Sequence, residues 1–215
     1  MTDIDKYYTR LDTRQKEYYQ YLLDKSKSVI CVDSPAGTGK TTIAVMAGLQ
    51  LLEQGDVNKI YYIRFADDRS LRLGFLPGDT TDKTSIYMTP FYDACLELGL
   101  DKFHVDEMIS QEQIVLCTDI AMRGINISKA FVIIDESQNA RFNDLKLVLT
   151  RIKDDCKVAL IGHTGQIDNF KGTQEWAFQR YMIHLCKKNW AIQCSLPVNY
   201  RGRISSWADA LYLED

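Results

Sequence analysis

Several features that define whole classes of protein are missing from this sequence. No apolar run approaches the length of a membrane span, and the opening Met1–Asp5 segment is acidic, so no membrane span and no secretory signal is expected. The six cysteines include no C-x-x-C pair, which favours reduced core residues of a cytosolic protein over a disulfide framework or a zinc site. The formal net charge of −3 argues against nonspecific polyanion binding, although a local basic surface could still hold nucleic acid.

The length and composition suit one soluble α/β domain. The chain has 215 residues, of which 46% are hydrophobic and 26% are charged. This length is enough for a substantial core but too short for two full domains and a linker. We therefore expect residues 1–215 to form a single domain.

A glycine-rich stretch at Ser34–Thr42 has the pattern of a phosphate-binding loop. The apolar run 29–32 before it predicts a buried parallel strand, and residues 43–52 after it predict a packed helix. In a P-loop the backbone N–H groups face the phosphates, Lys40 reaches the β- and γ-phosphates, and the Thr41 hydroxyl binds magnesium. The predicted nucleotide-binding residues of the loop are Pro35, Ala36, Gly37, Thr38, Gly39, Lys40, Thr41 and Thr42.

The first position of this loop departs from the G-x-x-x-x-G-K-[ST] pattern. Ser34 stands where glycine is usual, and serine would adopt an unusual backbone geometry only at some cost. Gly37 and Gly39 keep the rest of the loop intact. The alternative interpretation is a plain Gly/Pro turn between strand and helix, which the flanking patterns disfavour.

A second motif lies at Phe131–Gln138, where an apolar run ends in two adjacent carboxylates. In such a Walker B arrangement, Asp135 holds magnesium through its water shell and Glu136 accepts a proton from the attacking water. A strand followed by an acidic helix cap is the alternative interpretation of this stretch alone. Together with the P-loop, the carboxylate pair predicts nucleotide hydrolysis.

The rest of the chain alternates strands with helices. Apolar runs predict strands over 59–63, 113–117, 131–134, 157–162 and 191–194, and helical spacing predicts helices over 12–25, 84–99, 142–152, 173–188 and 204–211. The segment 65–82 shows neither pattern, and such a long loop in a compact domain is usually functional. The alternation predicts a mostly parallel sheet with helices on both faces.

Three further residues are candidates because of their positions. Gln15, on the N-terminal helix within residues 1–26, could pair with N6 and N7 of adenine, although packing on the sheet is the default role of that helix. Gln166 could contact the γ-phosphate or position water, and a solvated turn is about equally consistent with its surroundings. Arg201 could stabilise charge on the transferring phosphoryl group, although spacing alone favours a surface arginine.

Four motifs taken in order resemble the PhoH family: Ala36–Thr41, Leu73–Asp79, Met122–Gly124 and Ile133–Asn139. The Leu-Gly-Phe-Leu-Pro-Gly sequence in the second motif is specific to that family. The resemblance covers nearly the whole chain and implies a three-layer RecA-like P-loop NTPase, similar to the nucleotide domains of superfamily 1 helicases. The compact form resembles the phage-encoded branch of the family.

The resemblance also implies roles for single residues. The P-loop and Walker B residues keep the roles given above, Gln15 matches an adenine-reading glutamine, and Gln138 contacts phosphate or water. Gln166 and Asp168 match part of the family's third motif, and Arg201 lies near its C-terminal arginine.

Three positions depart from the family pattern. Ser34 replaces a glycine, Phe65 stands where proline is usual, and His163 replaces the aspartate of Gly-Asp-x-x-Gln. The last change exchanges an acceptor-only carboxylate for an imidazole, which could alter the coupling between hydrolysis and motion.

We therefore predict a cytoplasmic ATPase that binds ATP and Mg²⁺, acts on RNA or single-stranded DNA, and forms a ring-like homo-oligomer. If the chain is phage-encoded, the compartment is the host cytoplasm. A small-molecule kinase is the first alternative, with Arg69 and Arg72 of the 65–82 loop as its lid. The second is a non-hydrolysing nucleotide-dependent binding module, if Ser34 and His163 disable the site.

Overall fold

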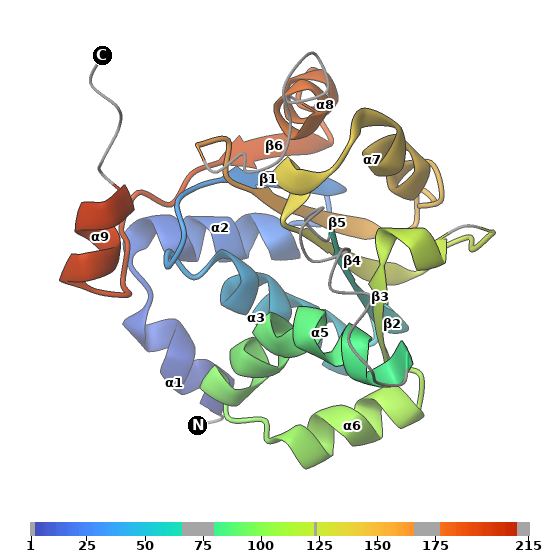
Figure 1. Cartoon of the computed structure of the whole chain (residues 1–215), viewed down its shortest axis with the longest axis horizontal. Helices are drawn as coiled ribbons and strands as arrows, with labels where there is room; N and C mark the ends of the chain where they lie inside the picture. The colour runs from blue at the N-terminus through green and yellow to red at the C-terminus, as the bar shows by residue number, and fades with distance from the viewer. Residues whose placement is uncertain (1–2, 66–79, 123, 166–176, 210–215) are drawn as a thin grey trace.

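The computed structural model describes residues 3–65, 80–122, 124–165 and 177–209. Six parallel strands form one sheet in the order β3-β2-β4-β5-β1-β6 (Figure 1). The strands are β1 (Val29–Asp33), β2 (Lys59–Arg64), β3 (Ile114–Thr118), β4 (Ala130–Asp135), β5 (Lys157–Gly162) and β6 (Ala191–Cys194). The helices are α1 (Asp3–Arg10), α2 (Thr13–Leu23), α3 (Lys40–Glu53), α5 (Thr80–Glu97), α6 (Lys102–Ser110), α7 (Phe142–Leu149), α8 (Ala177–Leu185) and α9 (Arg203–Asp209), with short 3₁₀ turns η2 (Asp119–Met122) and η3 (Ser137–Asn139).

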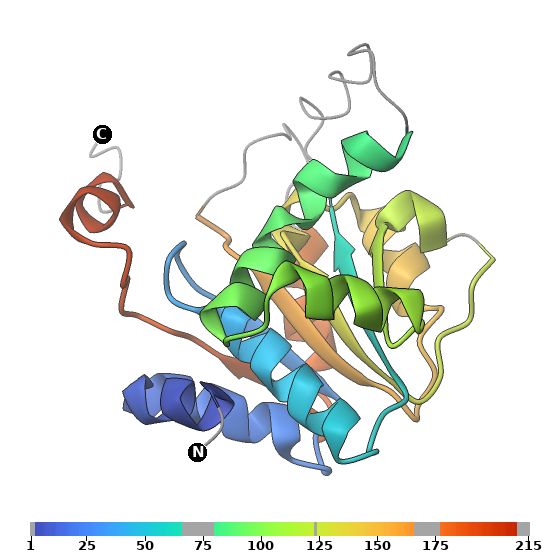
Figure 2. The same ribbon diagram turned by 90° about the horizontal axis from the view of Figure 1, so that it is seen from below.

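Helices cover both faces of the sheet. Helices α1, α2, α3, α5 and α6 pack on one face, and α7 and α8 pack on the other, as Figures 1 and 2 show. Alternate residues of β4 supply the two cores, because successive side chains of a strand point to opposite faces: Phe131 and Ile133 face α3, whereas Val132 and Ile134 face α7. The three-layer α/β architecture predicted from the sequence is confirmed.

The order of the strands determines where the two sequence motifs meet. β1 and β4 both pair with β5, so only one strand separates them. All three strands are parallel, and their carboxyl ends therefore lie at the same edge of the sheet. The loop after β1 and the carboxylates that end β4 consequently face the same region.

Two helices were not predicted. α1 precedes the predicted 12–25 helix as a separate element, and α2 begins at Thr13 because Asp12 accepts a hydrogen bond from the Gln15 N–H group at 2.7 Å and caps the helix. α6 buries only Val105 among its nine residues, so it has no apolar stripe that spacing could reveal.

Helix α5 begins at Thr80, which is earlier than the predicted start at residue 84, and it contains Pro90. Most of the predicted 65–82 loop, residues 66–79, lies outside the described residues.

Four of the six cysteines lie in the core, as predicted, and these are Cys31, Cys95, Cys117 and Cys156. Within the described ranges, no helix is both long enough and apolar enough to cross a membrane.

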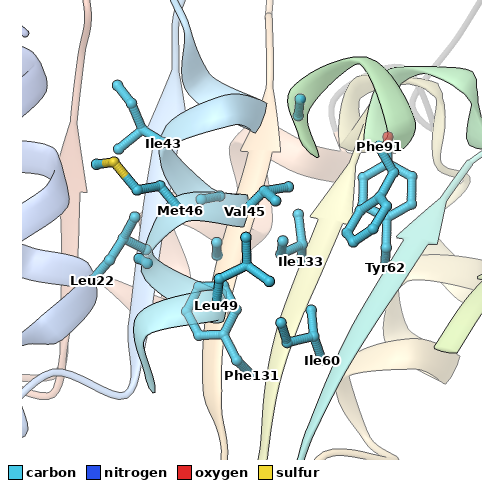
Figure 3. Packing of buried hydrophobic residues seen from close by; sticks show 14 of the residues in the cluster. Leu22, Ile43, Val45, Met46, Leu49, Ile60, Tyr62, Phe91, Phe131 and Ile133 are labelled. Carbon is cyan, nitrogen blue, oxygen red and sulfur yellow. The ribbon is translucent and has the colours of Figure 1, made fainter. Parts of the chain in front are cut away.

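Helix α3 lies unusually close to the sheet. Figure 3 shows its side chains packed between α2 and β4, with Phe131 below them. A Cβ atom on Gly48 would lie 2.9 Å from Cδ1 of Phe131 and 3.3 Å from Cδ1 of Ile60. This close approach packs α3 at Gly48 directly against the side chains of β2 and β4.

We predict that Gly48→Ala destabilises the protein, although alanine favours a helix by about 1 kcal/mol over glycine. The added methyl group would overpack the contact with Phe131, which typically costs about 1–3 kcal/mol. Urea denaturation measures the effect, and the double variant Gly48→Ala/Phe131→Leu should recover part of the loss. Equal or higher stability of the single variant would contradict the steric explanation.

Candidate functional site

The P-loop depends on two glycines with left-handed backbone geometry. Gly37 and Gly39 have φ angles of 76° and 83°, a region that favours glycine. A Cβ atom on Gly37 would lie 2.6 Å from Oδ1 of Asn199, so the segment after β6 packs directly on the loop. The Tyr200 N–H group donates to the Gly37 carbonyl at 2.8 Å. The loop is thus closed on one side by residues far away in the sequence.

Ser34 does not carry the strain expected from its position. Within the described residues, the non-glycine residues with a positive φ angle are Glu112, Lys129 and Glu136, and Ser34 is not one of them. Its buried hydroxyl donates to the Asp33 carbonyl at 2.7 Å and accepts the Leu196 N–H group at 2.6 Å. The expectation of a backbone cost at Ser34 is therefore wrong, and its side chain ties the loop to the segment after β6.

Lys40 lies folded against its own loop. Its ammonium group donates to the carbonyl of Ser34 at 2.6 Å and also to that of Pro35. Burial lowers the pKa of Lys40, and the nearby charges of Asp135 and Glu136 oppose that shift. An ammonium group binds an anion more strongly than it binds neutral carbonyls, so Lys40 can exchange its hydrogen bonds to these carbonyls for hydrogen bonds to an anion.

The Walker A threonine and the Walker B aspartate lie in contact. The Thr41 hydroxyl donates to Oδ2 of Asp135 at 3.2 Å, and Oδ1 of Asp135 accepts the Glu136 N–H group at 3.0 Å. Asp135 is 5% exposed. A hydroxyl beside a buried carboxylate is the kind of oxygen donor set that magnesium prefers, so these residues fit that ion.

Glu136 is held in a strained backbone conformation by two side-chain partners. Its φ angle is 53°, in the left-handed region that glutamate rarely adopts. Gln138 donates to Oε2 of Glu136 at 2.6 Å, and a guanidinium nitrogen of Arg64 lies 3.5 Å from Oε1. Burial raises the pKa of Glu136, and the charge of Asp135 raises it further.

Gln138 connects Glu136 to the end of β5. Its Oε1 atom accepts the backbone N–H group of His163 at 3.1 Å. His163 is 8% exposed, and its Nδ1 atom has no hydrogen-bond partner among the residues that the structure describes. The residue after it, Thr164, donates from its backbone and its hydroxyl to the Asp33 carboxylate. The ends of β1, β4 and β5 are therefore joined by side-chain hydrogen bonds.

Gln15 connects the N-terminal helix to the P-loop. Its amide donates to the Thr38 carbonyl at 3.0 Å and accepts the Asp12 N–H group at 3.0 Å, which completes a capping box at the start of α2. The other oxygen of Asp12 accepts the Tyr200 hydroxyl at 2.6 Å. A ring of contacts thus runs from the P-loop through Gln15 and Asp12 to Tyr200 and back to Gly37.

These residues surround a cavity of about 820 Å³. Of the residues that the sequence proposed, those that line it are Gln15, Ala36, Gly37, Thr38, Gly39, Lys40, Thr41, Thr42, Asp135, Glu136, Gln138 and Arg201. Pro35 is not among the residues that line the cavity, and its carbonyl accepts from Lys40. The Thr42 hydroxyl donates to Glu97 on α5. Gln166 and Asp168 lie outside the described residues.

Sequence reasoning missed several residues that line the same cavity. Tyr7 and Arg10 come from the unpredicted α1, Asp93 and Glu97 come from α5, and Tyr200 precedes Arg201. Among these residues, only Tyr200 could have been found from the sequence, because it directly precedes the candidate Arg201. The others lie on helices whose cavity-facing sides show no motif.

Comparisons with known proteins agree with this geometry. The model of the family described as PhoH-like protein matches residues 9–196. The PhoH-like protein of Bacillus subtilis (strain 168) is 36% identical over 161 residues, which are 74% of this chain and 49% of that protein. Protein PhoH of Escherichia coli (strain K12) is 32% identical over 149 residues, which are 69% of this chain and 42% of that protein. The chain therefore spans about half the length of the curated relatives it matches.

A solved structure has the same fold at low sequence identity. The large terminase of a thermophilic bacteriophage, in complex with ADP, superposes with a TM-score of 0.52 and 12% identity, over 86% of this chain and 44% of that one. The similarity confirms the predicted RecA-like P-loop NTPase fold.

The raised pKa of Glu136 predicts a pH-dependent stability difference between the wild type and Glu136→Gln. The native state binds the Glu136 proton more tightly than the unfolded chain does, so ionisation of Glu136 destabilises the native state as the pH rises above its ordinary pKa of 4.5. Glutamine does not ionise. The melting temperature of Glu136→Gln minus that of the wild type should therefore increase between about pH 4 and about pH 7.

The exposed Glu53 on α3 supplies the control, because Glu53→Gln should show no comparable increase. A constant difference for Glu136→Gln across the pH range would contradict the effect of burial on this carboxylate.

Proposed function

Because the chain belongs to the PhoH-like family, we propose that it binds ATP with Mg²⁺ and hydrolyses the γ-phosphate with water. One observation carries the proposal: the Thr41 hydroxyl lies 3.2 Å from the Asp135 carboxylate, with Glu136 as the next residue, in the same cavity as the P-loop. A phosphate cradle, a metal-type donor pair and a carboxylate base are what phosphoryl transfer to water requires.

The loop and its neighbours supply nucleotide binding. Lys40 exchanges the carbonyls of Ser34 and Pro35 for phosphate oxygens, and the N–H groups at the start of α3 face the same anion. Gln15 reads adenine. This role is compatible with its contacts, because an amide has two N–H donors and two acceptor lone pairs, and Thr38 and Asp12 each use one.

Thr41 and Asp135 would hold the magnesium ion, which supplies charge neutralisation at the phosphates when it is bound. Glu136 acts as the general base, and its raised pKa brings it nearer to the operating pH, where a base is most effective. Gln138 fixes the Glu136 carboxylate at 2.6 Å, and Gln166 assists in positioning the water. Arg201, which lines the cavity beside Gly37, stabilises charge on the transferring group.

The proposal also covers the nucleic-acid partner, the compartment and the oligomeric state. We place the protein in the cytoplasm, in a phage-infected host if it is phage-encoded, and propose RNA or single-stranded DNA as its partner. Residues 1–215 act as one domain, with 65–82 as a functional insert. We also propose a homo-oligomeric ring, in which a neighbouring subunit contributes to the site.

Helix α9 supports this assembly. Figures 1 and 2 show it standing apart from the helices that cover the sheet. Its Ile204 and Trp207 side chains are 89% and 83% exposed, and it follows directly after Arg201 at the cavity. Exposed apolar anchors next to an active site suit contact with a second copy of the chain.

Replacing Glu136 with Gln should leave ATP affinity within about threefold of the wild type while lowering turnover by about 10²–10⁴-fold, because only the proton acceptor is lost. Phosphate release without any added acceptor measures turnover, and a fluorescent ATP analogue measures affinity. Lys40→Ala is the matched variant that should lose binding itself.

The product distinguishes the alternatives. Free phosphate formed without an acceptor excludes a kinase, whereas ATP binding with no phosphate from the wild type supports a non-hydrolysing binding module. Unchanged turnover in Glu136→Gln would remove this residue as the base.

A single-stranded RNA or DNA oligonucleotide should raise the wild-type ATPase rate, and sedimentation should give a mass of several subunits. Trp207→Ser should lower that mass, because it removes an exposed apolar anchor without touching the cavity. The exposed Phe103 on α6 supplies the control, since Phe103→Ser removes comparable apolar area elsewhere. No stimulation by either polymer would overturn the nucleic-acid part, and a monomeric wild type would overturn the ring.

A further inference from the structure

A buried tyrosine hydroxyl contacts the Walker B aspartate from inside the core. Tyr62 on β2 is fully buried, and its hydroxyl donates to Oδ2 of Asp135 at 2.7 Å. In the β2–β4 register, Tyr62 lies opposite Ile133 and Arg64 lies opposite Asp135. The tyrosine therefore lies opposite the residue two positions before Asp135, and it reaches the carboxylate from within the core. Tyr62 is not among the residues that line the cavity.

Core packing fixes the position of this hydroxyl. The Tyr62 ring lies against Phe91 of α5, with ring centroids 5.2 Å apart and an interplanar angle of 52°. Figure 3 shows the two rings side by side between β2 and α5. A phenylalanine at this place would satisfy the packing equally well, so the hydroxyl needs an explanation of its own.

The Asp135 carboxylate accepts hydrogen bonds at both of its oxygens. Oδ1 accepts the Glu136 N–H group, and Oδ2 accepts from both Tyr62 and Thr41. The contact with Tyr62 is 0.5 Å shorter than the 3.2 Å contact with Thr41. The Tyr62 hydroxyl holds Oδ2 and the Glu136 N–H group holds Oδ1. These two bonds restrain rotation of the carboxylate even when Thr41 uses its own hydroxyl oxygen to bind a metal ion.

A phenol suits this role better than a cation does. The Tyr62 phenol is an uncharged group whose hydroxyl donates to Oδ2 of Asp135. A neutral donor orients the carboxylate but leaves its negative charge available to a metal ion. A lysine or arginine in the same place would compete with the metal for that charge.

We propose that Tyr62 is a positioning residue that holds the Asp135 carboxylate in the orientation that binds magnesium. The inference rests on the proposed function, in which Thr41 and Asp135 hold that ion. Partners that orient a metal-binding side chain typically change metal affinity by about 10–100-fold when they are removed.

The test is the Mg²⁺ dependence of nucleotide binding by Tyr62→Phe, which keeps the ring and removes only the hydroxyl. A fluorescent ADP analogue is titrated without metal and then at increasing MgCl₂. We expect its affinity without metal to stay within about twofold of the wild type, while the Mg²⁺ concentration at the midpoint rises by about 10-fold or more.

Two matched variants separate positioning from packing. Tyr61→Phe removes a hydroxyl from the neighbouring residue of β2, which packs on the opposite face of the sheet, and should leave the midpoint unchanged. Phe91→Leu loosens the packing around Tyr62 but keeps the hydroxyl, so it should lower the melting temperature with little change in the midpoint.

A wild-type Mg²⁺ midpoint in Tyr62→Phe would overturn the proposal, and so would an equal loss of affinity with and without metal. The variant Asp135→Asn distinguishes a failure of the Tyr62 proposal from a failure of the proposed metal site. If Asp135→Asn abolishes the Mg²⁺ dependence and Tyr62→Phe does not alter it, only the role of Tyr62 is wrong. If Asp135→Asn also binds the nucleotide with the wild-type Mg²⁺ dependence, the metal assignment in the proposed function is wrong.

Discussion

The parallel pairing of β1 and β4 with the shared strand β5 is the constraint on which the whole site depends. It places the P-loop and Asp135 at one edge of the sheet, where hydrogen bonds join the strand ends. The Thr164 backbone and hydroxyl donate to Asp33, and the Gln138 side chain accepts the His163 N–H group. Because these strands are buried on both faces, a one-residue shift of register would exchange the side chains that pack in the two cores. The geometry of the site is therefore maintained by the hydrophobic core more than by its own polar contacts.

The P-loop is stabilised from outside by two distant segments, the N-terminal part of α2 and the segment after β6. The Leu196 N–H group donates to the Ser34 hydroxyl, and the Tyr200 N–H group donates to the Gly37 carbonyl. The Gln15 amide donates to the Thr38 carbonyl. A glycine-rich loop loses much conformational entropy on ordering, and these contacts offset part of that cost before a nucleotide arrives. The two segments also contact each other, because the Tyr200 hydroxyl donates to the Asp12 carboxylate.

Much of the fold was predictable because its signals are local. Strands buried on both faces appear as continuous apolar runs, and β5 and β6 were predicted with their observed bounds. The P-loop and the carboxylate pair were found because their chemistry requires fixed spacing along the chain. Helix α6 was missed because a single buried residue, Val105, gives no periodicity.

The contacts that orient the site could not be predicted, because they join residues far apart in the sequence. Ser34 looked like a defect in a glycine pattern, yet its partner Leu196 lies 162 residues away. Tyr62 looked like one more apolar residue of a strand, and only the register with β4 reveals where its hydroxyl points. Gln166 and Asp168 remain predictions, since they lie outside the described residues.

The two adjacent carboxylates differ in their surroundings, and this difference supports a division of roles. Asp135 accepts hydrogen bonds from the Thr41 and Tyr62 hydroxyls and from the Glu136 N–H group, which suits a metal-binding group. Glu136, one residue further, turns away through a left-handed backbone conformation into a place where burial raises its pKa. Without that turn, successive side chains of an extended strand would point to opposite faces of the sheet. The left-handed φ angle of Glu136 thus accompanies the placement of both carboxylates in one cavity, as the proposed division of roles requires.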